Sequence, residues 1–310
     1  MKREIRIGAR GSKLAGIQAE LVAAIIRQSY PESNVTTHKV VTEGDRNRNV
    51  QLDQMAGIGI FVRELEEALL NNRIDLAVHS LKDMPMEIPQ KLCLCAVTER
   101  ADARDVLVSG SGGLDKLPPG SRIGTSSFRR AIQVTSYRPD LKMCSIRGNI
   151  DTRLRKVSHG EVDGIILAAA ALLRLGWENQ VSEYLPVDHF LPAIGQGTLA
   201  IESRIADEET NKLITVINHL PTWQSITAER AFLAALGGGC RAPIAALGTV
   251  NGTTLELKGM VADTGGQRIL YNHEEGNTAE PENLGERLAQ KILNQGASEF
   301  IMELRTGEKG

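Results

Sequence analysis

The sequence predicts an α/β protein with two similar domains on mainly parallel sheets, followed by a small C-terminal α+β domain. Three observations lead to this prediction. The chain has 310 residues, more than one ordinary core holds. Short apolar strands alternate with helical patterns, and this alternation starts again after Arg100. After residue 220 the pattern changes to alternating segments separated by glycine turns.

The first domain is expected over residues 1–98. A strand at 4–7 leads through a turn into a helix that Ser12 caps. The helix is predicted from apolar residues at spacings of three and four: Leu14, Ile17, Leu21 and Ile25. The other elements are a strand at 35–42, a polar loop at 43–59, a helix at 61–70 and a strand at 75–79.

The second domain is expected over residues 104–192 and repeats this order. Its strands are predicted at 122–124, 143–146 and 163–168, with helices at 128–137, 150–157 and before 176. A glycine-bearing segment at 191–200 formally satisfies GxGxxA, but it lacks the clear strand and the later acid of a dinucleotide site. We interpret it as a hinge that returns the chain to the first domain.

The third domain is expected over residues 220–310. A short helix at 227–236 runs into Gly237-Gly238-Gly239-Cys240. Three strands at 244–250, 253–262 and 267–273 are separated by turn signals at Asn251-Gly252 and Gly265-Gly266. A final helix is predicted over 281–293.

Composition and charge exclude several classes of protein. A net charge of −2 argues against a broad nucleic-acid surface. The longest apolar stretch, 165–173, has nine residues and is too short to cross a bilayer. No secretory signal is visible, so we expect a cytoplasmic protein without a membrane partner. The cysteines show neither CxxC pairs nor a disulfide framework, and we expect no metal site: Cys93, Cys95, Cys144 and Cys240.

Arginine outnumbers lysine by 24 to 12, and its placement is informative. Arginines and hydroxyl groups fall at strand-to-helix turns, which lie at the ligand-binding edge of doubly wound sheets. Helix N-termini there also attract anions. The sequence therefore predicts a site for a ligand with many carboxylates or phosphates. Its candidate residues are Arg10, Ser12, Lys82, Asp83, Ser127, Arg129, Arg130, Arg147 and Arg153.

Several of these residues have a plainer interpretation. A lone arginine at a turn is usually solvated, but Arg129 and Arg130 begin a helix, where cations oppose the dipole, and this favours a bound anion. Asp83 is either a helix cap or a carboxylate in a low-dielectric cleft that stabilises a cation or moves a proton. Glu43 and Asp45 compete for that role. Cys240 suggests a tethering point more than an activated nucleophile.

Five blocks carry a resemblance to a known family. They are Val78-His79-Ser80-Leu81-Lys82-Asp83-Met84-Pro85, Gly124-Thr125-Ser126-Ser127-Phe128-Arg129-Arg130, Arg147-Gly148-Asn149-Ile150-Asp151-Thr152-Arg153-Leu154, Leu191-Pro192-Ala193-Ile194-Gly195-Gln196-Gly197 and Gly237-Gly238-Gly239-Cys240. In this order they resemble the porphobilinogen deaminase (hydroxymethylbilane synthase) family over essentially the whole chain.

The resemblance implies a transferase of tetrapyrrole (heme) biosynthesis. Such an enzyme joins four porphobilinogen molecules head to tail into hydroxymethylbilane and releases ammonia. It implies a dipyrromethane cofactor held by a thioether to Cys240, with Asp83 as the catalytic acid. It also implies residues that bind cofactor or substrate carboxylates: Arg10, Ser12, Lys82, Thr125, Ser127, Arg129, Arg130, Arg147, Arg153 and Arg174.

The resemblance also implies two periplasmic-binding-protein-like domains, the first completed by a returning segment at 198–216, and we expect a monomer. Two positions depart from the family. Ile58 stands where a loop lysine is common, and Asp151 places a negative charge close to Arg153. A second hypothesis is a non-catalytic anion-binding protein, or the effector module of a regulator. It leaves Asp83 and Cys240 unexplained.

Overall fold

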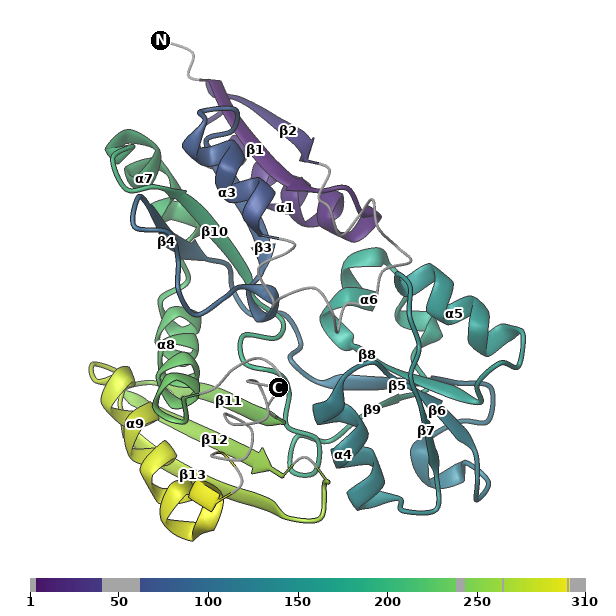
Figure 1. Ribbon diagram of the computed structural model, residues 1–310. Coiled ribbons are helices and arrows are strands. Elements are labelled where there is room, and N and C mark those ends of the chain that lie inside the picture. The colour runs from purple at the N-terminus through teal and green to yellow at the C-terminus, as the bar shows by residue number, and fades with distance from the viewer. Residues whose placement is uncertain (1–3, 41–61, 238–242, 264, 300, 302–310) are drawn as a thin grey trace. The chain divides into compact units, whose positions relative to one another are not determined.

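The computed structural model describes residues 4–40, 62–237, 243–263, 265–299 and 301 (Figure 1). The chain forms two compact units. Unit 1 comprises residues 1–101 and 198–223, and unit 2 comprises residues 102–197 and 224–310. The loop expected at 43–59 lies outside the described residues, as does the segment 238–242.

Unit 1 contains a five-stranded sheet in the order β2-β1-β3-β10-β4. β1 pairs in parallel with β2 and β3, whereas β10 pairs antiparallel with β3 and β4. The strands are β1 (Glu4–Arg10), β2 (Asn34–Val40), β3 (Leu76–Ser80), β4 (Leu92–Val97) and β10 (Leu199–Arg204). The helices are α1 (Lys13–Ser29), α3 (Arg63–Leu70) and α7 (Glu208–Ile214), with short 3₁₀ turns at Leu81–Asp83 and Thr215–Ile217.

Helix α1 begins as predicted, because the Ser12 Oγ accepts a hydrogen bond from the Ala15 N–H at 3.1 Å. The apolar series that indicated the helix is not its buried face. Leu21 is 45% exposed, and the residues that pack on the sheet are Ala15, Ala19, Val22, Ala23 and Ile26. Both series have helical spacing, so periodicity alone could not choose between them. The small alanines let the helix lie close to the strands.

Unit 2 contains a second five-stranded sheet in the order β7-β6-β8-β5-β9. β6 pairs in parallel with β7 and β8, whereas β5 pairs antiparallel with β8 and β9. The strands are β5 (Asp105–Ser109), β6 (Arg122–Gly124), β7 (Lys142–Cys144), β8 (Gly164–Ala168) and β9 (Glu183–Tyr184). The helices are α4 (Phe128–Tyr137), α5 (Ile150–Ser158) and α6 (Ala169–Leu175).

The two five-stranded sheets therefore have one topology. β1, β2 and β3 correspond to β6, β7 and β8, and one antiparallel strand follows in each sheet, β10 or β5. The predicted similarity of the two α/β units is confirmed. The prediction of mainly parallel pairing needs correction, since two of the four strand pairings in each sheet are antiparallel. The antiparallel strands β5 and β10 were not among the predicted strands, and their apolar runs carry no strand direction.

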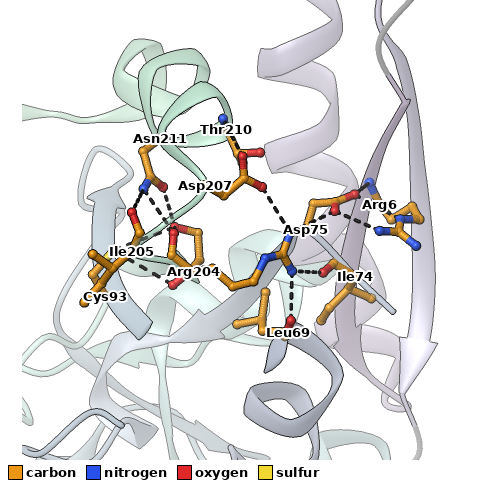
Figure 2. Close-up of polar contacts among 11 residues, drawn as sticks. Arg6, Leu69, Ile74, Asp75, Cys93, Arg204, Ile205, Asp207, Thr210 and Asn211 are labelled. Carbon is orange, nitrogen blue, oxygen red and sulfur yellow. Dashed lines mark hydrogen bonds and ion pairs between the residues drawn. The ribbon is translucent and has the colours of Figure 1, made fainter. Parts of the chain in front are cut away.

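The correspondence extends to single side chains. The Asp75 carboxylate, just before β3, accepts bonds from the Arg6 backbone N–H at 2.9 Å and its Nε at 3.0 Å (Figure 2). Asp163, just before β8, accepts bonds from the Arg122 N–H at 2.7 Å and its Nε at 3.3 Å. Each arginine carbonyl in turn accepts a bond from its aspartate N–H at 2.8 Å. The same pair of contacts thus joins β1 to β3 in unit 1 and β6 to β8 in unit 2.

The C-terminal part of unit 2 is a three-stranded antiparallel sheet in the order β11-β12-β13. Its elements are β11 (Ile244–Asn251), β12 (Thr254–Ala262), β13 (Ile269–Asn277), α8 (Leu220–Ala235) and α9 (Pro281–Ile292). The two predicted glycine turns are confirmed, with Gly252 and Gly266 at positive φ. Helix α8 begins seven residues earlier than the expected start at 227.

A shared apolar cluster joins this small sheet to the rest of unit 2. Ile132 of α4 and Leu191 pack with Met260 and Ala262 of β12. Gly259 lies against α8 and α9, where a Cβ atom would be 2.8 Å from the Phe232 ring. Residues expected to form the second and third domains thus belong to one compact unit.

Candidate functional site

The candidate residues of unit 1 lie at one edge of its sheet. Arg10 is the last residue of β1, and Ser12 is the N-cap of α1. Lys82 and Asp83 lie in the 3₁₀ turn that follows β3. Since β1 and β3 are parallel neighbours, their carboxyl ends meet at the same edge. The Gln18 Nε2 donates to the Ser80 Oγ at 3.0 Å and ties α1 to the end of β3.

Asp83 projects from a firmly held turn. Leu81 on one side is buried, and its N–H donates to the Thr198 carbonyl at 3.0 Å. Met84 on the other side is buried, and its N–H donates to the Leu81 carbonyl at 3.0 Å. The Asp83 side chain itself is exposed, so the expected low-dielectric setting is absent from the described residues. Among these residues it caps no helix either, which leaves its carboxylate available.

A buried acid, Glu202, lies on β10 of the same sheet, and a partly buried acid, Glu66, lies on α3. His79, on β3, lies 3.0 Å from the Glu202 carboxylate of β10 through its Nε2 atom, and both side chains are nearly inaccessible. Burial, and then the negative charge of Glu202, raises the pKa of Glu66 on α3. Sequence reasoning did not identify Glu202. An acid inside the apolar run of β10 was the signal that could have indicated it.

In unit 2, two hydroxyl groups shape the turn between β6 and α4. The Thr125 Oγ1 accepts a bond from the Ser127 N–H at 3.1 Å. Ser127 is the N-cap of α4, and its Oγ accepts from the Arg130 N–H at 3.4 Å. Thr125 is buried, so its hydroxyl group mainly holds the turn. These contacts place Arg129 and Arg130 in the first turn of the helix.

Arg129 and Arg130 do not extend into solvent. Both are more than 90% buried, and both bind the carboxylate of Asp105 on β5. Arg129 donates from Nη2 at 2.8 Å, and Arg130 donates from Nε at 3.0 Å and from Nη2 at 2.7 Å. The sequence predicted a bound anion at this helix start, and the Asp105 carboxylate of the protein itself supplies one.

Gln196 completes this cluster from the glycine-bearing segment. Its Nε2 donates to Asp105 at 2.9 Å and to the Ala103 carbonyl at 2.7 Å. Burial would raise the pKa of Asp105, but the charges of Arg129 and Arg130 outweigh it and hold that pKa far below the ordinary value. Sequence reasoning missed Asp105, although an acid at the start of an apolar strand is a usable signal.

The segment that carries Gln196 is held from the opposite side by a second buried acid. Glu229 of α8 accepts bonds from the Gly195 N–H at 2.7 Å and from the Gly248 N–H at 2.8 Å. Gly195 and Gly197 both have positive φ. The element that follows is strand β10 rather than a helix, which excludes a dinucleotide-binding turn here.

Unit 2 retains an excess of positive charge after these pairings. Two guanidinium groups face one carboxylate, which leaves one uncompensated cation in the cluster. Burial, and then the charge of Arg130, lowers the pKa of Arg153 on α5. Arg153 donates to the Gly148 carbonyl at 2.9 Å and to the Ser126 Oγ at 3.1 Å, and no ion pair with Asp151 occurs among the described residues. Neutral partners therefore leave its charge available for an anion.

The remaining arginines differ in burial. Arg174, near the end of α6, donates to the Gly197 carbonyl at 2.6 Å, and burial lowers its pKa to about 10. Arg147 is exposed in the turn between β7 and α5. Cys240 and Ile58 lie outside the described residues, as do Glu43 and Asp45. Within the described residues, no three His, Cys, Asp or Glu side chains could hold a metal ion, and no helix is long and apolar enough to cross a membrane.

Comparisons with known proteins agree with this chemistry. A family model described as porphobilinogen deaminase, dipyromethane cofactor binding domain, matches residues 5–212, and one described as its C-terminal domain matches residues 223–294. The porphobilinogen deaminase of Geobacter metallireducens is 48% identical over 97% of this chain and 95% of that protein. The chain belongs to the porphobilinogen deaminase family. The member from Pelobacter propionicus is 45% identical over 97% of both chains.

Similarity to solved structures is weaker. The BenM effector binding domain with its effector benzoate matches 70% of this chain and 91% of its own length. Its sequence identity is 18% and its TM-score is 0.43, too low to support the effector-module hypothesis. Family membership rests on the sequence relatives instead.

Proposed function

We propose that this chain is the transferase that joins four porphobilinogen molecules into hydroxymethylbilane with release of ammonia. One observation carries the proposal. The match to the dipyromethane cofactor binding domain covers residues 5–212, which include every proposed site residue except Cys240. The excess of buried positive charge in unit 2 supports it, because each porphobilinogen carries carboxylate groups that need cationic partners.

We propose that the arginines bind these carboxylates in two ways. Arg10, Arg147, Arg153 and Arg174 supply direct charge-assisted hydrogen bonds, with Lys82, Ser12, Thr125 and Ser127 assisting. Arg129 and Arg130 act on a ligand carboxylate through the N–H donors that remain beside their bonds to Asp105 and to the carbonyls of Leu191 and Ile166. Each guanidinium carries five N–H donors, so pairing with Asp105 does not exhaust them.

The donor set fits an acid-rich dipyrromethane bound through a thioether to Cys240. When bound, that group supplies the pyrrole carbon to which the first porphobilinogen is joined. The residues of unit 2 that would hold its carboxylates are Arg129, Arg130 and Arg153, and the lowered pKa of Arg153 indicates that a nearby anion would be stabilised. Cys240 would hold the dipyrromethane group by one covalent bond.

We propose that Asp83 assists the departure of the amino group of porphobilinogen and stabilises the positive charge that develops nearby. Its carboxylate is exposed, and the described residues give it no competing donor. Leu81 and Met84 fix its backbone from both sides. A charged group on a fixed turn can act as a general acid or as an electrostatic stabiliser. We further propose a cytoplasmic monomer, which sedimentation would test.

Intact-mass measurement tests the covalent cofactor. Purified protein incubated with porphobilinogen should be heavier than its sequence by one dipyrrole. The Cys240→Ser variant should have its sequence mass, and a matched Cys144→Ser variant should keep the additional mass. A parent protein that stays at its sequence mass after this incubation would contradict the proposal and favour a non-catalytic anion-binding protein.

Turnover measurements test Asp83. Asp83→Asn keeps the size of the side chain but removes the acid, so porphobilinogen consumption should fall by about 10²- to 10⁴-fold. The fold should persist, because the side chain is exposed and makes no structural contact among the described residues. Glu87→Gln, at a neighbouring exposed acid, is the matched control and should retain activity. Consumption by Asp83→Asn near the parent rate would remove Asp83 from the catalytic role.

A further inference from the structure

Strand β4 contains an irregularity that places two cysteines on one face. Leu94 pairs with Glu202 and Ala96 pairs with Ile201, so Cys95 lies unpaired between two successive β10 partners. This is a β-bulge, which bends a strand and reorients its side chains. The core contacts agree with it. Leu92 packs with the Leu65 cluster, whereas Ala96 packs in the Ile5 cluster.

In an unbroken strand, Leu92 and Ala96 would lie on the same face, because side chains alternate with a period of two. They lie on opposite faces, so the bulge reverses the alternation. Cys95 packs against the same cluster as Ala96. Cys93 precedes the bulge on the face opposite Leu92, and its Cα is paired with that of Ser203. Both thiols therefore lie on the face of the sheet that α1 covers.

The surroundings of the two sulfur atoms are polar. The Cys93 Sγ lies 3.7 Å from the Ser203 Oγ, and the Cys95 Sγ lies 3.2 Å from the Ile201 carbonyl oxygen. β4 is the last strand of its sheet, and both cysteines are half-buried. Figure 2 shows Cys93 beside the polar contacts of Ile205 and Asn211.

We propose that Cys93 and Cys95 form a modification site that reacts with small disulfides of the glutathione class and closes to an internal disulfide. The Cys93 thiolate attacks one sulfur atom of the disulfide, which forms a mixed disulfide and releases one thiolate. Cys95 then loses its proton to solvent and attacks the Cys93 sulfur, and a second thiolate leaves. The protein loses two hydrogen atoms in total, and the small disulfide is reduced to two thiols.

The assignment of Cys93 as the attacking group follows from its surroundings. The neighbouring Cys95 thiol lowers the pKa of Cys93 and outweighs the effect of burial, and the hydroxyl group of Ser203 adds to this lowering. The same contact, together with burial, raises the pKa of Cys95. Cys93 is thus the more acidic thiol of the pair and the better attacking group, and Cys95 is the thiol that displaces glutathione from the mixed disulfide.

The distance between the two residues makes the internal bond feasible and labile. Residues i and i+2 of a regular strand lie about 6.6 Å apart, near the upper limit for Cα atoms joined by a disulfide. A bend at Cys95 shortens this span. A disulfide near the geometric limit is readily reduced, so we expect the modification to be reversible by excess thiol.

Peptide mass analysis of the full chain tests this proposal. The purified protein is incubated with glutathione disulfide, quenched with acid and digested with trypsin. Cleavage after Lys91 and Arg100 isolates both cysteines in one peptide, and the peptide 143–147 carries Cys144 as the control thiol. We expect the 92–100 peptide to lose two hydrogen atoms without retaining glutathione, and to recover them after incubation with excess glutathione. Cys240 is in a separate peptide, so the result does not depend on the proposed cofactor.

Two variants separate the roles of the cysteines. Cys95→Ser should stop at a single glutathione on Cys93, because no second thiol can displace it. Cys93→Ser should react about tenfold more slowly, at Cys95. The proposal is overturned if the parent 92–100 peptide stays reduced while Cys144 reacts, or if it retains glutathione instead of closing. It is also overturned if Cys95→Ser, with the parent circular dichroism spectrum, gains no adduct on Cys93.

Discussion

The two five-stranded sheets share one topology but differ in the partners of their buried acids. Each places an acid on its antiparallel strand, Glu202 on β10 and Asp105 on β5. In unit 1 that acid contacts only His79 among the described residues and has Glu66 nearby. In unit 2 the acid is surrounded by two guanidinium groups and an amide. A repeated fold thus pairs its buried acid with one imidazole in the first copy and with two guanidinium groups in the second.

This difference suggests a division of labour between the units. After β3, unit 1 continues with Lys82 and Asp83, whereas after β8 unit 2 continues with a row of alanines. At the first helix the situation is reversed, since α4 begins with Arg129 and Arg130 and α1 has no arginine in its first turn. We therefore assign anion binding mainly to unit 2 and the catalytic carboxylate to unit 1.

Removing the buried acid should give the largest difference between the units. Asp105→Asn leaves two buried guanidinium groups without a counter-charge and should lower the free energy of unfolding by about 3 to 5 kcal/mol. Glu202→Gln removes a charge from an acidic group and keeps an oxygen that His79 can contact, so its cost should be smaller. Urea unfolding of both variants at pH 7 makes the comparison. Equal losses would show that the two guanidinium groups around Asp105 do not make it the more costly acid to remove.

The stability contribution of Asp105 should also depend on pH in a defined direction. The pKa of Asp105 is lowered in the folded chain, so the unfolded chain binds its proton more readily. The contribution of Asp105 to stability is complete above about pH 4, the ordinary pKa of an aspartate, and is lost as the pH falls towards the folded value. The difference between parent and Asp105→Asn should therefore be constant from pH 5 to pH 7 and should shrink only below that range.

Much of this fold could be predicted from local pattern, and the failures have physical causes. The capping residues Ser12 and Ser127 and the glycine turns act through neighbouring atoms, so the sequence reveals them directly. The alternation of strand and helix patterns, which starts again after Arg100, also indicated the repeat. The pairing of Arg130 with Asp105 could not be foreseen, because it depends on an antiparallel strand whose direction no local pattern encodes.

Two equivalent glycines test how alike the two sheets are in packing. A Cβ on Gly8 would lie 2.4 Å from the Ile74 Cδ1, and a Cβ on Gly124 would lie 2.8 and 2.9 Å from the Ile146 Cδ1 and Cγ2. The Cδ1 of Ile74 ends a side chain that can rotate, whereas the Cγ2 of Ile146 is fixed close to the backbone. Both alanine variants should lose about 1 to 3 kcal/mol of stability, and Gly124→Ala should lose more. Thermal unfolding of the two variants measures both losses. A larger loss for Gly8→Ala would mean that the packing around Gly8 in unit 1 is more rigid than the packing around Gly124 in unit 2.

The smallest expected effect concerns Asp75 and Asp163. Asp75 is 14% exposed and is also bound by the Arg204 Nη2 at 3.1 Å (Figure 2). Asp163 is 40% exposed, and Arg122 is its only ionic partner among the described residues. Burial opposes ionisation of Asp75, but the bonds from Arg6 and Arg204 outweigh it and lower its pKa. Asp75→Asn should therefore cost about 1 kcal/mol at pH 7, and Asp163→Asn should cost less. The Asp75 contribution should be complete above about pH 4 and should decline as the pH falls further. Urea titrations at pH 7 and pH 3 would check both statements, and a larger loss for Asp163→Asn would mean that the contacts of Asp163 are the stronger ones despite its exposure.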